Sequence, residues 1–177
     1  QIIFLIFSPT LSLKIIFFLF SIIGYLSMFL LMRNVFKFDA YTSLLCSCLF
    51  LFNGFFIYRA IAGHLAYLSY IFVPLYCYFL LKSQKNNNNL NYIYLILSSF
   101  ILANFFHSGS GPIILIIFTS ILTVILFYSF FSNNLKIFYN FFISMIFGIL
   151  ISLSKITASL FFLSNFPRIY PPTEFLS

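Results

Sequence analysis

The sequence predicts an all-α membrane protein whose helices cross the bilayer several times. Hydrophobic residues make up 63% of the 177 residues and charged residues only 6%, and the mean hydropathy is +1.11. A water-facing surface of this size needs more polar side chains than the chain contains, so lipid must be its main solvent. Charges also interrupt the apolar runs about every 20 residues, which is the length that a helix needs to cross a hydrocarbon core of about 30 Å.

The apolar runs predict a transmembrane helical bundle of about six membrane helices. Asn53-Gly54 and Pro74 interrupt the second and third runs, where we expect a bend or break, with ordinary packing irregularity as the alternative reading. Residues 156–163 are too short to span the membrane, and we expect a re-entrant or interfacial turn there. The predicted spans are residues 15–32, 41–58, 66–81, 90–106, 113–131 and 137–154.

The whole chain, residues 1–177, is interpreted as a single transmembrane domain fragment that is truncated at both ends. The first residue is Gln1 and not methionine, and residues 171–177 resemble a loop that leads to a further segment. A cleaved signal peptide also removes a methionine, but no charged leader or small-residue cleavage site supports that reading.

The basic residues predict the orientation, because Lys and Arg in short loops favour the cytoplasmic side. Five of them fall in alternate connections and therefore share one side: Arg33, Lys37, Lys82, Lys85 and Lys136. Four fall on the other side, which we assign to the outer face: Lys14, Arg59, Lys155 and Arg168. This topology places Asn34 and Asn86 on the cytoplasmic side, and Gly63 and Ser108 on the outer side.

Several classes of function are disfavoured by the residue pattern. The net charge of +7 comes from single cations between apolar runs and not from a basic patch, so we expect no nucleic acid partner. The three cysteines lie inside apolar runs, and no His or Cys set has metal-binding spacing, so we expect no metal and no cofactor. The many aromatic residues follow from the biased composition and receive little functional weight.

The segment from Arg59 to His64 is the most specific local feature of the sequence. It forms a tight outer hairpin in which Gly63 can take the left-handed backbone of a sharp turn. A cation five residues before a histidine would suit a phosphate-bearing ligand, with Arg59 as a charge clamp and His64 as a hydrogen-bond donor. The alternative is an interfacial arginine whose charge reaches the headgroups, beside a histidine that caps the hairpin.

A second outer hairpin is predicted from His107 to Pro112. Its sequence is His-Ser-Gly-Ser-Gly-Pro, and Pro112 suits the first turn of the next helix. The backbone N–H groups of this hairpin could hold an anion at a helix N-terminus, or the segment is simply a turn.

Several short motifs, taken in order, resemble one family of membrane enzymes. They are Gly24-Tyr25-Leu26 leading to Arg33, then Leu51-Phe52-Asn53-Gly54, Gly63-His64-Leu65 and Val73-Pro74-Leu75, and finally Lys155-Ile156-Thr157-Ala158 followed by residues 162–168. Together they resemble bacterial membrane glycosyltransferases of the GT-C superfamily. The last motif looks like the segment that leaves the membrane before an extracytoplasmic loop.

The resemblance implies transfer of a sugar from a polyprenyl-phosphate carrier at the outer face of the bacterial inner membrane. Such proteins use an acidic residue in their first large outer loop as a base. Neither Asp39 nor Glu174 fits that position, so we expect the catalytic acid outside this fragment. The residues expected near the lipid phosphate are Arg59, His64, His107, Lys155 and Arg168.

Two other functions remain open at this point. A multi-spanning transporter or permease subunit would explain broken helices and polar residues at membrane depth. An inverted repeat would favour the transporter, and we detect none between the first three and the last three spans. A structural subunit, such as those of respiratory membrane complexes, fits the composition but gives the outer basic residues no role.

Overall fold

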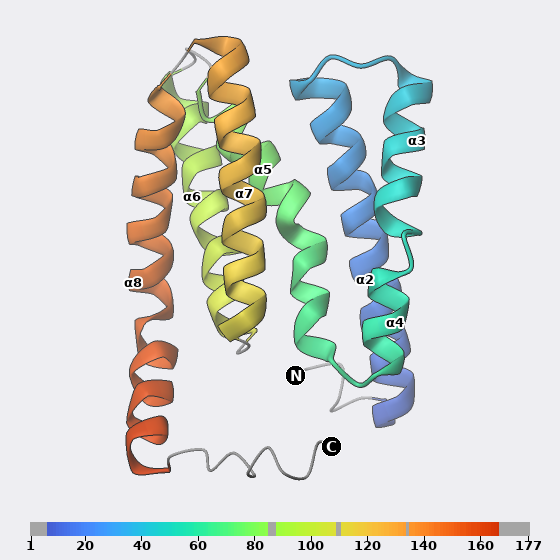
Figure 1. The fold of residues 1–177 in the computed structure, drawn as a ribbon, viewed down its shortest axis with the longest axis vertical. Helices are drawn as coiled ribbons and strands as arrows, with labels where there is room; N and C mark the ends of the chain where they lie inside the picture. The colour runs from blue at the N-terminus through green and yellow to red at the C-terminus, as the bar shows by residue number, and fades with distance from the viewer. Residues whose placement is uncertain (1–6, 85–87, 109–110, 134, 167–177) are drawn as a thin grey trace, which may run out of the picture.

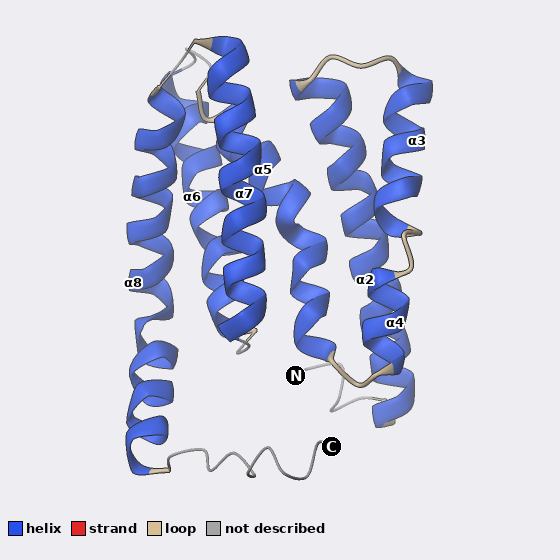
Figure 2. Ribbon diagram, viewed as in Figure 1, coloured by secondary structure: helices blue, strands red, loops and turns tan. Residues whose placement is uncertain are grey.

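The computed structural model describes residues 7–84, 88–108, 111–133 and 135–166. These residues fold into helices that run up and down along one common direction, and no strand occurs within the described ranges (Figures 1 and 2). The prediction of an all-α bundle is confirmed.

The described helices form six consecutive rods, one at the place of each predicted span. The first rod is α2 (Pro9–Leu30), continued by the π-helical turn η1 (Leu31–Val35). The second is α3 (Ala40–Leu51) followed by α4 (Phe55–Ile61), and the third is the 3-10 helix η2 (Leu65–Phe72) followed by α5 (Val73–Lys82). The remaining rods are α6 (Asn88–His107), α7 (Gly111–Ser132) and α8 (Lys136–Asn165).

Length and surface composition indicate an integral membrane protein. Four helical stretches are long and apolar enough to cross a membrane: Pro9–Val35, Ala40–Ile61, Ile113–Ser132 and Lys136–Asn165. Large apolar side chains also cover the outside of the bundle, for example Leu115, Phe127 and Phe147, which are 67%, 63% and 54% exposed. A lipid bilayer is the solvent that tolerates such a surface.

The second rod breaks at the predicted place. α3 ends at Leu51 and α4 begins at Phe55, with Gly54 between them at φ 82°, a left-handed conformation that glycine adopts without steric cost. The Asn53 side-chain oxygen accepts a hydrogen bond from the Phe55 backbone N–H at 2.9 Å. This bond satisfies one of the free N–H groups at the start of α4.

The third rod has the fewest residues, but its 3-10 half makes it longer than an α-helix of the same number of residues would be. η2 has 8 residues and α5 has 10. Because a 3-10 helix rises about 2.0 Å per residue and an α-helix about 1.5 Å, together they extend about 31 Å, close to the thickness of a hydrocarbon core. Pro74 lies in the first turn of α5, where its missing N–H costs nothing.

The last rod differs from the prediction. We expected a span over residues 137–154 and a separate turn over residues 156–163, but α8 is one continuous helix of 30 residues, about 45 Å long. Lys155 suggested an end, yet its side chain is exposed on the helix surface and interrupts no backbone hydrogen bond. The sequence has no Gly or Pro between Gly148 and Pro167, so nothing stops the helix earlier.

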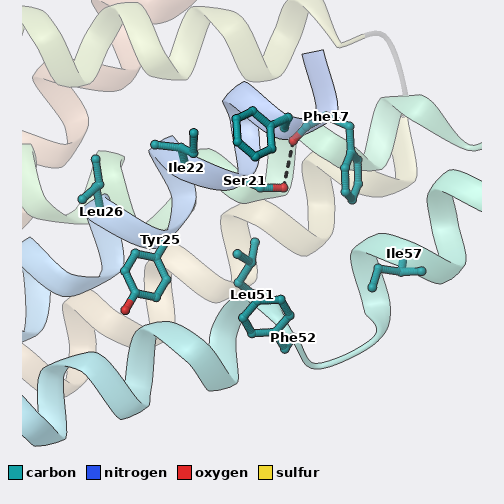
Figure 3. Close-up of a pocket in the computed structure, with 9 residues that line it drawn as sticks. Phe17, Ser21, Ile22, Tyr25, Leu26, Leu51, Phe52 and Ile57 are labelled. Atoms are coloured by element: carbon teal, nitrogen blue, oxygen red, sulfur yellow. Dashed lines mark hydrogen bonds between the residues drawn. The ribbon is translucent and has the colours of Figure 1, made fainter. Parts of the chain in front are cut away.

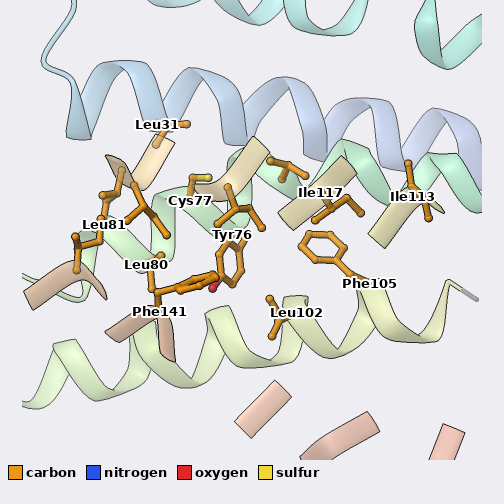
Figure 4. Close-up of a cluster of buried hydrophobic side chains, with 14 residues drawn as sticks. Leu31, Tyr76, Cys77, Leu80, Leu81, Leu102, Phe105, Ile113, Ile117 and Phe141 are labelled. Atoms are coloured by element: carbon orange, nitrogen blue, oxygen red, sulfur yellow. The ribbon is translucent and has the colours of Figure 1, made fainter. Parts of the chain in front are cut away.

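The core of the bundle surrounds α5. Figure 4 shows Tyr76 of α5 among Leu102 and Phe105 of α6, Ile117 of α7 and Phe141 of α8. The Tyr76 hydroxyl is 3.1 Å from the Ser144 hydroxyl of α8, so a buried polar pair joins the two helices. In an apolar interior each of these hydroxyls would otherwise lack a partner.

The ends of the rods alternate along the bundle axis. At the top of the bundle in Figure 1, η1, α5 and α7 end. The helices that follow them, α3, α6 and α8, begin at the same end. The end of α4 and the start of η2 lie at the opposite end, which we call the Arg59 end, together with the end of α6 and the start of α7. The order of the connections therefore agrees with the predicted topology.

Candidate functional site

Arg59 lies in the last turn of α4, surrounded by aromatic rings. Its guanidinium carbon is 4.3 Å from the centroid of the Tyr67 ring, 5.6 Å from that of Phe55 and 5.9 Å from that of Tyr58. The side chain is half-buried. Because aromatic faces attract cations, these rings hold the charged group in one orientation at the Arg59 end.

His64 approaches the same guanidinium from the other side of the turn. Gly63 takes φ 75°, and the backbone N–H of His64 donates to the Arg59 carbonyl at 2.9 Å. Nη1 of Arg59 is 3.4 Å from Nδ1 of His64. Since a guanidinium only donates, this contact requires Nδ1 to accept, which leaves the His64 proton on Nε2. The His64 ring itself is exposed and stacks on Tyr67.

The Arg59 guanidinium retains unused hydrogen-bonding capacity. Its Nε is buried and has no hydrogen-bond partner. No carboxylate of the described residues pairs with it, since Asp39 caps α3 at the opposite end of the bundle. Glu174 lies outside the described residues. The buried Nε is covered by protein atoms, so a ligand would have to use the terminal nitrogens of the guanidinium. A half-buried cation with no anionic partner in the described part of the chain is the chemistry of an anion site.

The other predicted site residues are not all brought to Arg59. His107 is the exposed last residue of α6, at the Arg59 end, and no hydrogen bond or ring contact of the described residues joins it to Arg59 or His64. Lys155 lies in the C-terminal half of α8, and Figure 1 shows that half and α4 on opposite sides of the bundle. Arg168 lies outside the described residues. The expected clustering thus holds for Arg59 and His64 and does not extend to Lys155.

The aromatic partners of Arg59 are site residues that sequence reasoning missed. Phe55 is four residues before Arg59 on the same helix, a spacing that places two side chains on one face. Tyr67 comes three residues after His64, within the first turn of η2. The signal was therefore present, but the abundance of Phe and Tyr in the whole chain concealed it.

The described residues contain no group of three or more His, Cys, Asp or Glu side chains that could hold a metal ion.

Comparisons with protein-family models, with curated proteins and with solved structures found no match.

Proposed function

We propose that Arg59 and His64 bind the phosphate of a lipid-linked sugar donor, and that the chain is part of a membrane glycosyltransferase acting on polyprenyl-phosphate-linked sugars. The observation that carries the proposal is the Arg59 guanidinium, which is held by aromatic rings at one end of a membrane bundle. No carboxylate of the described residues pairs with this guanidinium, since Asp39 caps α3 at the opposite end of the bundle.

The expected chemistry is electrostatic stabilisation of a phosphate leaving group. A guanidinium presents its donors in a planar fork that matches two phosphate oxygens, and the rings around Arg59 reduce the entropy lost on binding. Nε2–H of His64 supplies a further donor on the exposed side of the pair. Charge that develops on the leaving phosphate is stabilised most where such donors are already oriented. We assign no general base among the described residues.

The proposal is tested by replacing Arg59 in the full-length protein. Arg59→Ala should lower sugar transfer from a polyprenyl-phosphate donor about 10- to 100-fold, because a hydrogen bond to a charged group contributes about 1.5 to 3 kcal/mol. Arg59→Lys should restore transfer in part, since it returns the charge without the planar fork. The measurement is sugar transfer in membranes that contain equal amounts of each variant.

The matched control is Arg33→Ala. Arg33 is an exposed arginine at the opposite end of the bundle, where its Nη1 donates to the Phe38 carbonyl at 2.9 Å. Its loss should leave transfer unchanged. Equal transfer by wild type and Arg59→Ala would contradict the phosphate contact.

A transporter is the second candidate, and the break in the second rod favours it. Discontinuous membrane helices commonly form transport sites, because their unwound segments expose backbone groups at mid-membrane depth. Phe52, Asn53 and Gly54 form such a segment within Ala40–Ile61, and all three are exposed. If the wild type transfers no sugar from several donors, but vesicles take up a phosphate-bearing solute in an Arg59-dependent way, this second function is supported and the transferase is not.

A further inference from the structure

A groove with apolar walls runs along α2 beside the break in the second rod (Figure 3). One wall is the face of α2 from Phe17 to Leu26, and the other is formed by Leu51, Phe52 and Ile57. This section has a volume of about 410 Å³. Figure 3 shows these side chains on α2, at the end of α3 and on α4.

The groove continues toward the Arg59 end of the bundle. A second section of about 470 Å³ is lined by Lys14 of α2, Ala60 of α4 and Leu68 of η2, and it shares Phe17 and Ser21 with the first. Both sections are lined by Phe17, Phe18 and Ser21, so they are neighbours along the same face of α2. We call the two sections together the α2 groove.

The break at Gly54 explains why the α2 groove is open. α3 packs along α2, whereas α4 packs mainly on η2 after the chain has turned at Gly54. The Phe55 ring makes edge contacts with Tyr67 and Tyr70 of η2, and the Phe56 ring packs at a tilt on Tyr70. The face of α2 beyond the break is therefore left without the helix that would have covered it.

Between Phe17 and Leu26, the polar side-chain atoms of the walls contact other atoms of the protein. The Ser21 hydroxyl donates to the Phe17 carbonyl at 2.8 Å, as Figure 3 shows. The Tyr25 hydroxyl is 4.0 Å from the sulfur of Cys48. What the groove offers to an occupant between Phe17 and Leu26 is thus hydrocarbon surface, which favours an apolar chain.

The length and the charge of the groove restrict the occupant further. From Lys14 to Leu26 the α2 axis extends about 18 Å, and one leaflet contributes about half of the 30 Å hydrocarbon core. Lys14 is exposed and lines the mouth of the groove at the Arg59 end. An occupant with one leaflet-length chain and an anionic head matches both the depth and the charge.

We propose that the α2 groove binds one acyl chain of an anionic phospholipid from the leaflet at the Arg59 end, with the Lys14 ammonium at the lipid phosphate. A partner helix would need a channel about 10 Å wide along a whole span, and a polyprenyl chain would extend beyond one leaflet. The site does not depend on the proposed transferase, because the Arg59 guanidinium lies against Tyr67, whereas Ala60 and Leu68 face the groove.

The experiment places the full chain in nanodiscs of phosphatidylcholine that contain a small fraction of phosphatidylglycerol with a photoreactive acyl chain. Labelling should concentrate on peptides that carry Phe18, Ile22 and Ile57, and unlabelled phosphatidylglycerol should compete while phosphatidylcholine does not. Lys14→Gln should reduce this labelling about tenfold, the loss expected for one charge-assisted contact. Ser21→Phe should abolish it by filling the groove.

Matched variants separate this site from general lipid contact. Lys155→Gln removes another exposed cation. Thr123→Phe puts a ring in place of an exposed side chain whose hydroxyl, like that of Ser21, donates to a carbonyl of its own helix, at 2.8 Å. Both should label like wild type, and so should Arg59→Ala, even if the transferase proposal fails. Labelling spread over the outer faces of α7 and α8, equal competition by phosphatidylcholine, stronger competition by polyprenyl phosphate, or crosslinks to a second copy of the chain would each overturn the proposal.

Discussion

Asp39 shows how one side chain can determine where a membrane helix starts. Because Asp39 follows Arg33 and Lys37 in the same short loop, the sequence by itself predicts a solvated surface ion pair. In the structure its carboxylate instead accepts the Thr42 backbone N–H at 3.1 Å and the Thr42 hydroxyl, and it is the N-cap of α3. These hydrogen bonds to Thr42 lower the pKa of Asp39 below its usual value. A free N–H at the helix start thereby obtains a partner.

The lowered pKa predicts a pH dependence of stability. A carboxylate whose pKa is lower in the folded state stabilises the fold above its unfolded pKa, near 4, and that contribution is lost as the pH falls through the folded pKa. Wild type should therefore lose thermal stability in detergent micelles more steeply than Asp39→Asn between pH 5 and pH 2. Asn still caps the helix but does not titrate. Superimposable pH profiles of the two proteins would contradict this role.

Of the contacts that Arg59 makes, the one with His64 could be predicted from the sequence and the one with Tyr67 could not. The proximity of Arg59 and His64 follows from a short hairpin that contains Gly63, and the sequence predicts it. The stacking of Arg59 on Tyr67 at 4.3 Å depends on η2 starting as a 3-10 helix. With three residues per turn this helix directs Tyr67 differently from an α-helix, and the apolar pattern does not distinguish the two.

Helix α8 packs on α6 where a glycine allows close approach. A Cβ atom at Gly148 would lie 2.5 Å from Cδ2 of Leu102 and 3.0 Å from its Cβ, and Leu102 is fully buried. Small residues permit this contact between membrane helices, which van der Waals packing stabilises.

Gly148→Ala should therefore destabilise the bundle by about 1 to 3 kcal/mol, the usual cost of overpacking. The cost should be smaller in a Leu102→Ala background, where the space next to position 148 is vacated. Unfolding by denaturant in detergent would give the four free energies of this double-mutant cycle. Strictly additive costs would show that the two positions do not share one tight contact.

Element boundaries were predictable where breakers or charges coincide with them, and not elsewhere. Asn53-Gly54 and Pro74 mark real discontinuities of the second and third rods. Lys155 does not end α8, because a long cationic side chain on an exposed helix face can extend to the headgroups while the backbone continues. A single charge in an apolar run therefore predicts that this part of the helix lies near the headgroups. It does not predict that the helix ends there.

At the scale of the whole molecule, the alternation of helix ends and the distribution of cations together predict which end faces the cytoplasm. The end opposite to Arg59 carries Arg33, Lys37, Lys82 and Lys136, and cations in short loops are retained on the cytoplasmic side. The Arg59 end should therefore face outward, where a lipid-linked donor would be used.

Cysteine labelling in intact cells tests this orientation. In a background without the three native cysteines, Ala62→Cys and Ser108→Cys should react with an impermeant maleimide added outside, since both positions lie at the Arg59 end. Phe38→Cys and Ser132→Cys lie at the opposite end and should react only after the membrane is permeabilised. Labelling of Ala62 and Ser108 from different sides would contradict the order of the helices. Reversal of all four positions would leave the fold intact, but it would place Arg59 in the cytoplasmic leaflet and contradict the proposed reaction at the outer face.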